Sequence, residues 1–335
     1  MDVRDLALPV IGAPMAGGPS TPVLAAAVSD AGGLGFLAAG YKNPHAVATE
    51  VATVRATTTA PFGVNLFVVA SYQPDMAKVG AYRRTLEPEV AHFDIELGEA
   101  RWDDDYWQAK VDLVLDLRPD VVSFTFGCPS AGVLRQLASS GMLSMVTVTS
   151  VAEARVAVDR GAASLSVQGP NAGGHLGTWD LEAPPNQTPL LDLVSAVLAV
   201  VDVPVVAGGG IHDAAGLQSL RDAGAAAAQI GTAYLLAEEA GTNPTHRAAL
   251  VDSAFTETAL TRAYTGRWAR GLANRFIATH ADAPAGYPHL HHLTSPLRRA
   301  AAAAGDTDVA HMWAGTGHAH TRASTAADIT VSLAL

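Results

Sequence analysis

The chain has 335 residues, of which 49% are hydrophobic and 16% charged, and its formal net charge is −11. This composition supports a large core and excludes a wholly disordered chain. The acidic balance argues against a nucleic-acid partner, because nucleic-acid-binding proteins gather Lys and Arg on one face. The single cysteine, Cys128, excludes an intrachain disulfide and a cysteine-rich zinc or iron–sulfur site.

The amino-terminal segment lacks the pattern of a signal peptide. Asp2 and Asp5 place two acids in the first five residues, and a strand-like run follows directly. Gly, Pro or charged residues interrupt every apolar stretch before it reaches membrane-spanning length. We therefore expect a cytoplasmic protein with no membrane-bound part.

Short apolar runs recur along the chain, and each is followed by a segment of helical character. The runs are continuous rather than alternating in polarity, as expected for parallel strands covered on both faces. They occupy 9–15, 33–39, 61–67, 121–127, 143–149, 164–169, 203–209 and 227–232. Eight such units predict an α/β protein with a (β/α)8 TIM barrel rather than an open sheet.

Capping signals predict several of the helices between these runs. Thr21 followed by Pro22 opens a helix over 21–31. Ser150 opens a helix over 150–160, with Glu153 as its capping-box partner, and a helix over 213–222 follows the same pattern.

Two segments lie outside the repeat. A polar, acid-rich insertion spans about 68–119, and its run Asp103–Asp105 is interpreted as a solvated turn. A long tract from 245 to about 299 has helical character. We expect a barrel over 1–240 that contains the insertion, a mainly helical substrate or lid region over 241–300, and a segment over 301–335 that returns to the barrel.

Glycines follow the seventh and eighth runs, where barrels commonly bind phosphate. Backbone N–H groups at such turns approach an anion closely, and a helix N-terminus favours its charge. The residues are Ala207, Gly208, Gly209, Gly210, Gln229, Gly231 and Thr232. The alternative is that these glycines only make tight turns. No G-x-G-x-x-G follows the first strand, so FMN fits better than NAD.

His175 follows Gly173 and Gly174 in the loop that begins at Gln168 after the sixth run. A histidine at the catalytic end of a barrel, beside small residues, is suited to abstract a proton from a carbon acid. The alternative is a loop histidine that bonds only to backbone. The sequence predicts His175 as the catalytic residue.

Other candidates lie at the ends of the first, third and fourth runs. Ala13, Pro14 and Met15 are predicted beneath a flat ring, and Asn65 is predicted both to donate to and to accept from a flavin's pyrimidine edge. Nothing near Cys128 in the sequence lowers its thiol pKa. His289, His291 and His292 lack acidic partners at usable spacing, so they are interpreted as a solvated loop and no metal site is predicted.

Together these motifs resemble the nitronate monooxygenase family, formerly called 2-nitropropane dioxygenases, over nearly the whole chain. The matching stretches are APMAGGPSTPVLAAAVSDAGGLGFLAAG, FGVNLF, VVSFTFG, QGPNAGGHLG, VVAGGGI, AAAAQIGTAYLLAEE, TRAYTGRWARGLANRF and the tail that includes MWAGTGHA. The chain departs from the family pattern at Asn171, where an acidic residue is usual, at Trp268, where a small residue or Pro is usual, and at Cys128, which replaces an apolar residue.

The resemblance implies an FMN-containing barrel that oxidises alkyl nitronates with O2 to a carbonyl compound and nitrite, without a nicotinamide reductant. It implies that His175 is the base that acts on neutral nitroalkanes. It also implies flavin contacts at Ala13, Met15, Asn65, Gln168, Gly209, Gly231 and Thr232. A substrate such as propionate 3-nitronate would need a cation, for which Arg262, Arg267, Arg270 and Arg275 are candidates. A homodimer is expected.

Three alternatives stay open at this point. The first is an NAD(P)H-dependent FMN enzyme that reduces enoyl thioesters or quinones. The second is a non-catalytic FMN-binding barrel, in which His175 is a structural residue. The third is a flavin-free isomerase of phosphorylated sugars, which the glycines of the seventh and eighth runs alone would also fit.

Overall fold

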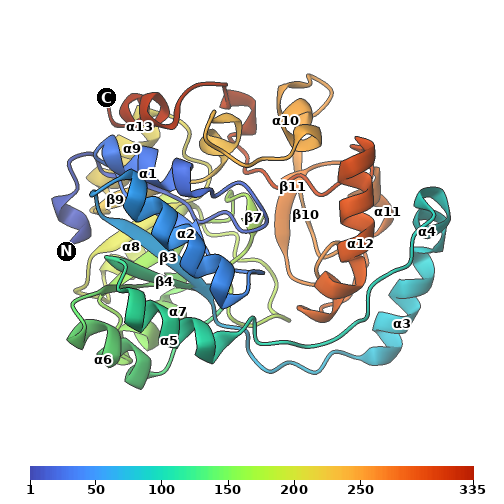
Figure 1. Cartoon of the computed structure of the whole chain (residues 1–335), viewed down its shortest axis with the longest axis horizontal. Helices are drawn as coiled ribbons and strands as arrows, with labels where there is room; N and C mark the ends of the chain where they lie inside the picture. The colour runs from blue at the N-terminus through green and yellow to red at the C-terminus, as the bar shows by residue number, and fades with distance from the viewer.

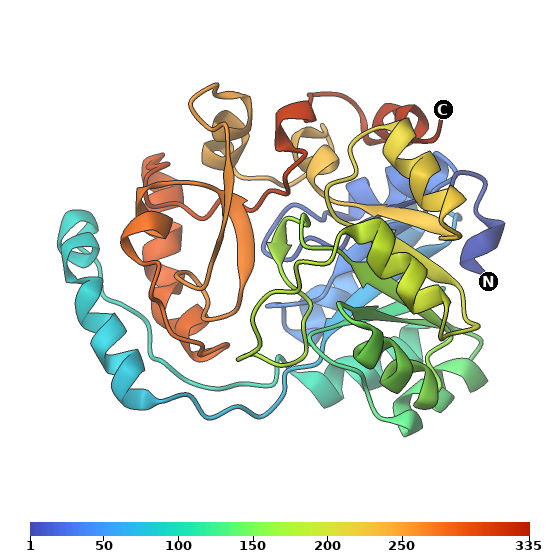
Figure 2. The same ribbon diagram turned by 180° about the vertical axis from the view of Figure 1, so that it is seen from behind.

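Eight parallel strands close into a barrel in the computed structural model, which describes residues 1–335 (Figures 1 and 2). Their order is β1-β9-β8-β6-β5-β4-β3-β2, and the parallel bridge Ile11–Leu34 joins β1 to β2. The strands are β1 (Val10–Gly12), β2 (Gly35–Ala38), β3 (Phe62–Phe67), β4 (Val121–Thr125), β5 (Leu143–Val148), β6 (Ser164–Gln168), β8 (Val205–Gly208) and β9 (Ala227–Ile230). All eight predicted strands and the TIM-barrel class are confirmed.

Helices surround the barrel, and their apolar faces cover the outer faces of the strands. They are α1 (Pro22–Asp30), α2 (Pro44–Thr57), α5 (Trp107–Leu117), α6 (Ala131–Ser139), α7 (Val151–Asp159), α8 (Leu190–Leu198), α9 (Ala214–Asp222) and α13 (Ala326–Ala334). The last of these, α13, packs against α1 and α9 and so takes the place of the eighth helix. Inside the barrel, a buried cluster that includes Ile11, Phe36 and Met145 fills the space. No helix has the length and apolarity needed to cross a membrane.

The predicted caps are present, with one difference. Thr21 and Ser150 accept hydrogen bonds from the third residues of their helices, Leu24 and Glu153. The carboxylate of Glu153, however, does not close a capping box on the Ser150 N–H. It accepts from Thr149 N, Thr149 Oγ1 and Trp179 N, at 2.6, 2.9 and 2.8 Å. Glu153 therefore ties α7 to the loop that follows His175.

A second body, here called the lobe, lies beside the barrel and has its own core (Figures 1 and 2). It contains α3 (Met76–Thr85), α4 (Glu87–Phe93), α10 (Pro244–Val251), α11 (Arg275–Thr279) and α12 (His289–Ala304). It also contains an antiparallel sheet, β10 (Thr258–Thr261), β11 (Ala269–Leu272) and β7 (Gly174–His175). Three short 3-10 turns, Val3–Asp5, Thr232–Leu236 and His318–His320, complete the structure.

The helical prediction for 245–299 holds at both ends of the tract and is wrong in the middle. Residues 258–272 form the hairpin-like pair β10 and β11, with Thr258 opposite Leu272 and Thr261 opposite Ala269. The pair is stable there because β11 also pairs with β7, a segment nearly 100 residues away in the chain. Tertiary pairing of this kind overrides local helical propensity.

The insertion at 68–119 divides between the two bodies. Helices α3 and α4 belong to the lobe, where α4 packs on α12, and Figure 1 shows them at its outer edge. Helix α5 instead packs against α2 and β3, so it is the helix of the third β/α unit.

The prediction of a solvated turn at Asp103–Asp105 is confirmed for Asp104, which is exposed, and is wrong for Asp105, which is buried. Its Oδ2 lies 2.6 Å from the ammonium of Lys110 on α5, and its Oδ1 accepts from the Tyr41 N–H at 2.9 Å. Lys110 also donates to Ala39 O at 2.9 Å. Burial raises the pKa of Asp105 to about 6 in spite of the ammonium beside it. The pair pins the loop after β2 to α5.

The predicted solvated loop at His289–His292 is also wrong. These residues form the first turn of α12, and the ring of His291 stacks on Tyr41 with centroids 4.1 Å apart. The Nε2 of His292 lies 2.5 Å from Asp103 Oδ2. Because Tyr41 and Asp103 belong to loops on the barrel side, this turn is part of the contact between barrel and lobe.

Replacing Lys110 with Met should destabilise the protein by about 3–5 kcal/mol, because a buried carboxylate loses its partner. The double variant Asp105→Asn/Lys110→Met should regain much of this loss, since no charge then stays buried. Chemical denaturation at pH 7 measures both. A double variant as unstable as the single one would contradict this account of the pair.

Candidate functional site

An elongated cavity opens at the carboxyl ends of the barrel strands, on the side that faces the lobe. Together with the space at its mouth that is open to solvent, it measures about 1480 Å³. Every predicted site residue except Ala207 lines it: Ala13, Pro14, Met15, Asn65, Gln168, Gly173, Gly174, His175, Gly208, Gly209, Gly210, Gln229, Gly231 and Thr232. Ala207 instead faces the core, fully buried.

One end of the cavity is built from backbone. Gly209 and Gly210 have φ angles of +130° and +85°, which side chains other than glycine rarely adopt. They turn the chain from β8 toward the N-terminus of α9, where unpaired N–H groups and the helix dipole favour an anion.

The carboxyl-terminal part of the chain closes over this end. Gly315 N donates to Thr232 Oγ1 at 3.0 Å, and Thr316 N donates to Asn171 O at 3.2 Å. A Cβ on Gly315 would lie only 2.7 Å from Asn171 O, so only glycine permits this approach. The backbone of Asn171, where the sequence departs from the family pattern, thus anchors the closing segment.

His212 is the titratable side chain at the glycine end, and the sequence analysis missed it. Its Nδ1–H donates to Gly210 O at 3.0 Å, and its ring stacks on His320 with centroids 3.9 Å apart. Neither Lys nor Arg lines any part of the cavity. Because the Nδ1–H of His212 is already used, backbone N–H groups and the Thr232 hydroxyl are the donors available to an anion here.

The middle of the cavity carries amides with unused hydrogen-bonding atoms. The side-chain amide of Asn65 donates to Ser123 Oγ at 2.9 Å and to Thr125 Oγ1 at 3.0 Å. Its Oδ1 accepts no hydrogen bond from the protein and is an acceptor open to the cavity. The prediction that Asn65 also donates to a ligand is therefore wrong. Gln229 shows the opposite arrangement, since its Oε1 accepts from Ser166 Oγ at 2.8 Å and its NH2 group is unused.

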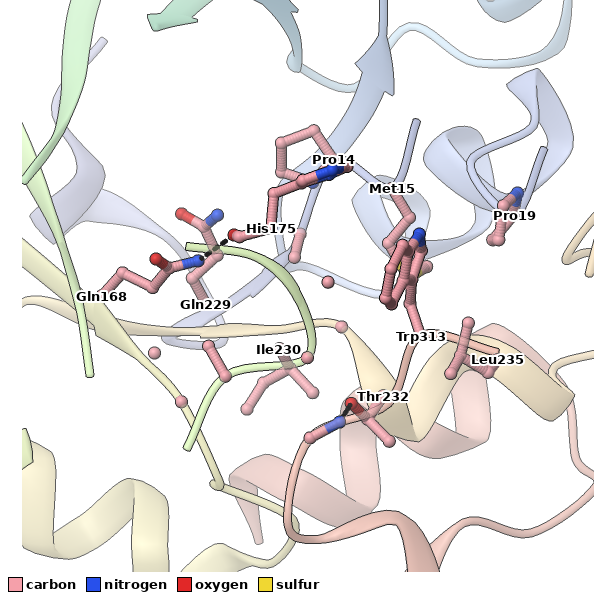
Figure 3. Close-up of a pocket in the computed structure, with 18 of the residues that line it drawn as sticks. Pro14, Met15, Pro19, Gln168, His175, Gln229, Ile230, Thr232, Leu235 and Trp313 are labelled. Carbon is pink, nitrogen blue, oxygen red and sulfur yellow. Dashed lines mark hydrogen bonds between the residues drawn. The ribbon is translucent and has the colours of Figure 1, made fainter. Parts of the chain in front are cut away.

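The side chain of Gln168 lines the cavity and also fixes the backbone of the loop that contains His175. Its Nε2 donates to His175 O at 3.1 Å, and its Oε1 accepts from Gly177 N at 2.7 Å. Figure 3 shows Gln168 and Gln229 in one part of the cavity, apart from Leu235 and Pro19.

These features fit FMN. A phosphate would lie at Gly208–Gly210, Gly231 and Thr232, among N–H donors and close to the N-terminus of α9. The open Oδ1 of Asn65 and the NH2 group of Gln229 offer an acceptor and donors to the pyrimidine edge of a flavin. Met15 and Trp313 supply apolar surface for a ring system.

His175 reaches the cavity because its backbone belongs to the lobe's sheet. As part of β7 it lies opposite Ala269 of β11, and Leu176 N donates to Trp268 O at 2.8 Å. Its Nε2 forms a hydrogen bond with Thr265 Oγ1 at 2.9 Å. Its Nδ1 has no partner in the protein and stays open to the cavity. The bond to Thr265 fixes the ring orientation and leaves Nδ1 as the reactive atom.

Aromatic rings enclose the imidazole of His175. The ring centroids of Trp313, Phe126 and Tyr287 lie 5.5, 5.7 and 6.0 Å away. Burial, together with the guanidiniums of Arg267 and Arg298, lowers the pKa of His175 to about 3. The ring is therefore neutral at physiological pH, and its low pKa makes it a weak base.

None of the four predicted cations lines the cavity. Arg275 bonds Glu89 on the lobe, Arg270 donates to Pro170 O, and Arg262 donates to Leu181 O. Arg267 is buried behind Phe126, with its Cζ 4.2 Å from the ring centroid. The prediction that they contact a substrate carboxylate is therefore wrong. Cys128 is buried as well, and burial raises the pKa of its thiol.

Sequence reasoning missed two further histidines that line the cavity, His246 on α10 and His311 after α12. Burial lowers the pKa of both, and that of His246 to about 4. Thr265, Arg298 and Phe126 were missed too, because each acts through a contact with a distant part of the chain.

Comparisons with known proteins agree with this geometry. Residues 3–335 match the model of the family described as nitronate monooxygenase. A Staphylococcus aureus protein named "Probable nitronate monooxygenase" is 36% identical over 92% of this chain and 88% of its own. The crystal structure of nitroalkane oxidase from Streptomyces ansochromogenes is 45% identical, with a TM-score of 0.94 over 99% of this chain and 96% of that one. FabK from Thermotoga maritima, at 24% identity, has a TM-score of 0.76 over 99% of this chain and 93% of its own and shares the fold.

Replacing Gly210 with Val should weaken FMN binding about 5- to 100-fold, because a side chain at this φ is strained and its Cβ would lie 2.9 Å from that of Asn171. Titration of the FMN-free protein with FMN, followed by flavin fluorescence, measures the change. Gly161→Val is the matched control: Gly161 has a φ of +97° with open space around it, in the turn between α7 and β6. Equal FMN affinities in the two variants would count against a cofactor site at Gly210.

His246→Gln should reduce the acid sensitivity of the fold. The unfolded chain takes up a proton on His246 near pH 6.5, whereas the folded protein does so only near pH 4. The stability that this histidine contributes is complete above pH 6.5 and is lost as the pH falls toward 4. The variant should lose about 2 kcal/mol less than the parent between pH 7 and pH 5, measured by denaturation at each pH. His45→Gln, at an exposed position on α2, should leave the dependence unchanged.

Proposed function

The chain belongs to the nitronate monooxygenase family, and on that premise we propose that it is an FMN-dependent oxidoreductase. In this proposal it oxidises alkyl nitronates with O2 to a carbonyl compound and nitrite, and it also accepts neutral nitroalkanes. The observation that carries the proposal is the position of His175. Its free Nδ1 opens into the same cavity whose glycine end and amides fit FMN.

FMN, when bound, supplies the electron acceptor and the place where O2 reacts. Gly208–Gly210, Gly231 and Thr232 would hold its phosphate, and Asn65 and Gln229 would orient its ring. The remaining chemistry belongs to the protein. His175 accepts a proton from the carbon next to the nitro group of a neutral nitroalkane at Nδ1, which converts the substrate to its nitronate.

The surroundings of His175 position it for this step rather than strengthen it as a base. Its lone pair is available at any pH in the physiological range because the imidazole is neutral, but the low pKa makes it a weak base, so the rate has to come from its orientation. The bond to Thr265 Oγ1 holds the ring still, so that Nδ1 keeps its direction. The rings of Phe126, Tyr287 and Trp313 limit the access of water to the reacting carbon.

An absorbance spectrum followed by anaerobic mixing with a nitronate tests the proposal. We expect a yellow protein whose flavin bands bleach when propyl-2-nitronate is added. A flavin that ignores nitronates and bleaches with NADPH would indicate a reductase instead, and one that responds to neither would indicate a binding protein. A protein that takes up no FMN would overturn the cofactor assignment.

His175→Asn should lower kcat/KM for neutral nitroethane about 10²- to 10⁴-fold, since a general base contributes in that range. Turnover of preformed ethylnitronate should change by less than about tenfold, because it needs no proton abstraction. Steady-state assays of nitrite release measure both, with His45→Asn as a control. Equal losses on the two substrates would show that His175 is not the carbon base.

A further inference from the structure

Histidines are the only side chains with an ionisable acid or base group in the walls of the cavity, and the pKa values of His175, His246 and His311 are lowered. None of its lining residues is Lys, Arg, Asp or Glu. A substrate at the reactive end therefore finds no cation or carboxylate within contact. Electrostatic selection of an anion therefore has to come from charged side chains that are buried behind the residues lining the cavity.

Two such charges are buried directly behind the reactive end, in Arg267 and Arg298. Their side chains belong to residues that are only 5% and 8% exposed, and neither guanidinium has a carboxylate within 4.0 Å. Their hydrogen bonds end on neutral groups. Arg267 Nη1 donates to Thr178 O at 2.6 Å, while its Nε has no partner. Arg298 donates to Thr294 Oγ1 at 3.1 Å and to His291 O at 3.0 Å.

Arg267 is one aromatic layer away from His175, and Arg298 is two rings away. Arg267 Cζ lies 4.2 and 5.3 Å from the rings of Phe126 and Tyr287, and these two rings flank the imidazole. Arg298 Nη2 donates to His291 Nδ1 at 3.1 Å, and the ring of His291 lies 6.2 Å from that of Tyr287. Both positive charges thus act on the same small volume.

The acids near this region do not cancel the two charges. The carboxylate oxygens of Glu153 accept hydrogen bonds from Thr149 and Trp179, and burial raises the pKa of this carboxyl group. Asp105 is paired with Lys110, so the two carry no net charge together. A buried charge without a counter-ion creates a strong field, since little water is present to screen it. That both arginines lower the pKa of His175 is consistent with such a field.

We propose that Arg267 and Arg298 are positioning residues that draw a singly charged, planar anion to His175 without touching it, and that the rest of this substrate is an uncharged alkyl chain. The proposal rests on the proposed nitronate oxidation and narrows its substrate class. A nitronate brings one negative charge, which the field stabilises. A second charge, such as the carboxylate of propionate 3-nitronate, would have to give up its water without a cation in contact.

The first experiment measures anion binding apart from turnover. The FMN-loaded enzyme is titrated with inorganic nitrate, a planar monoanion, and the flavin absorbance is followed. Arg267→Met and Arg298→Met should each weaken nitrate binding by about tenfold or more, while Arg→Lys at either position should restore most of the affinity. Arg262→Met is the matched control. This arginine also stacks on an aromatic ring, Trp268, but it is only partly buried, and the acidic side chains of Glu182 and Asp180 lie near it.

The second experiment uses the unmodified enzyme, so it stands even if the methionine variants fail to fold. We expect kcat/KM for 1-propylnitronate to exceed that for propionate 3-nitronate by about tenfold or more. An equal or better rate with propionate 3-nitronate would overturn the substrate assignment.

The two proposals fail in different ways. An enzyme that oxidises nitronates, but whose Met variants bind nitrate like the parent, disproves the role of the arginines alone. An enzyme that oxidises no nitronate disproves the proposed function, and the nitrate titration then still decides whether the two arginines attract an anion.

Discussion

The pairing of β7 with β11 is the contact on which the arrangement of the site depends. Through it the loop after β6 leaves the barrel at Gly174 and His175 and becomes the third strand of the lobe's sheet. The catalytic candidate is thereby fixed to the lobe, while the residues that fit FMN are fixed to the barrel. The distance between base and cofactor is set by how the two bodies pack. The contacts of Glu153 with Trp179 and of Tyr41 with His291 hold that packing in place.

Charge is distributed in layers around the cavity. The inner layer is neutral and consists of amides, hydroxyls, imidazoles and glycine backbone, which recognise shape and hydrogen-bonding pattern. The layer behind it holds Arg267, Arg298 and the Asp105–Lys110 pair, all desolvated. Because long-range fields pass through apolar side chains more easily than through water, the second layer acts on the contents of the cavity without competing for its hydrogen bonds.

The sequence was sufficient to predict the barrel and most of the cavity, because both rest on local signals. Continuous apolar runs mark the strands, and glycines at their carboxyl ends mark the turns that face a ligand. It was not sufficient where partners are distant in the chain. Residues 258–272 have helical character in isolation and form strands only because β7 offers them an edge. Asp105 and His291 look like surface residues until Lys110 and Tyr41 are placed beside them. Thr265 and Arg298 carry no motif at all.

The site includes residues from both ends of the chain. Ala13, in the first β/α unit, lines the same cavity as Gly317, and α13 packs against α1. During synthesis the amino-terminal strands leave the ribosome long before the segment that covers the glycine end and the helix that completes the outer ring. The sheet of the nascent chain therefore stays open until β9 has emerged to pair with β1, and the glycine end stays uncovered until Gly315 and Gly317 have emerged as well. Closure of the barrel and covering of the glycine end are thus separate events during synthesis, and a chain interrupted between them would have a closed barrel with an uncovered cavity.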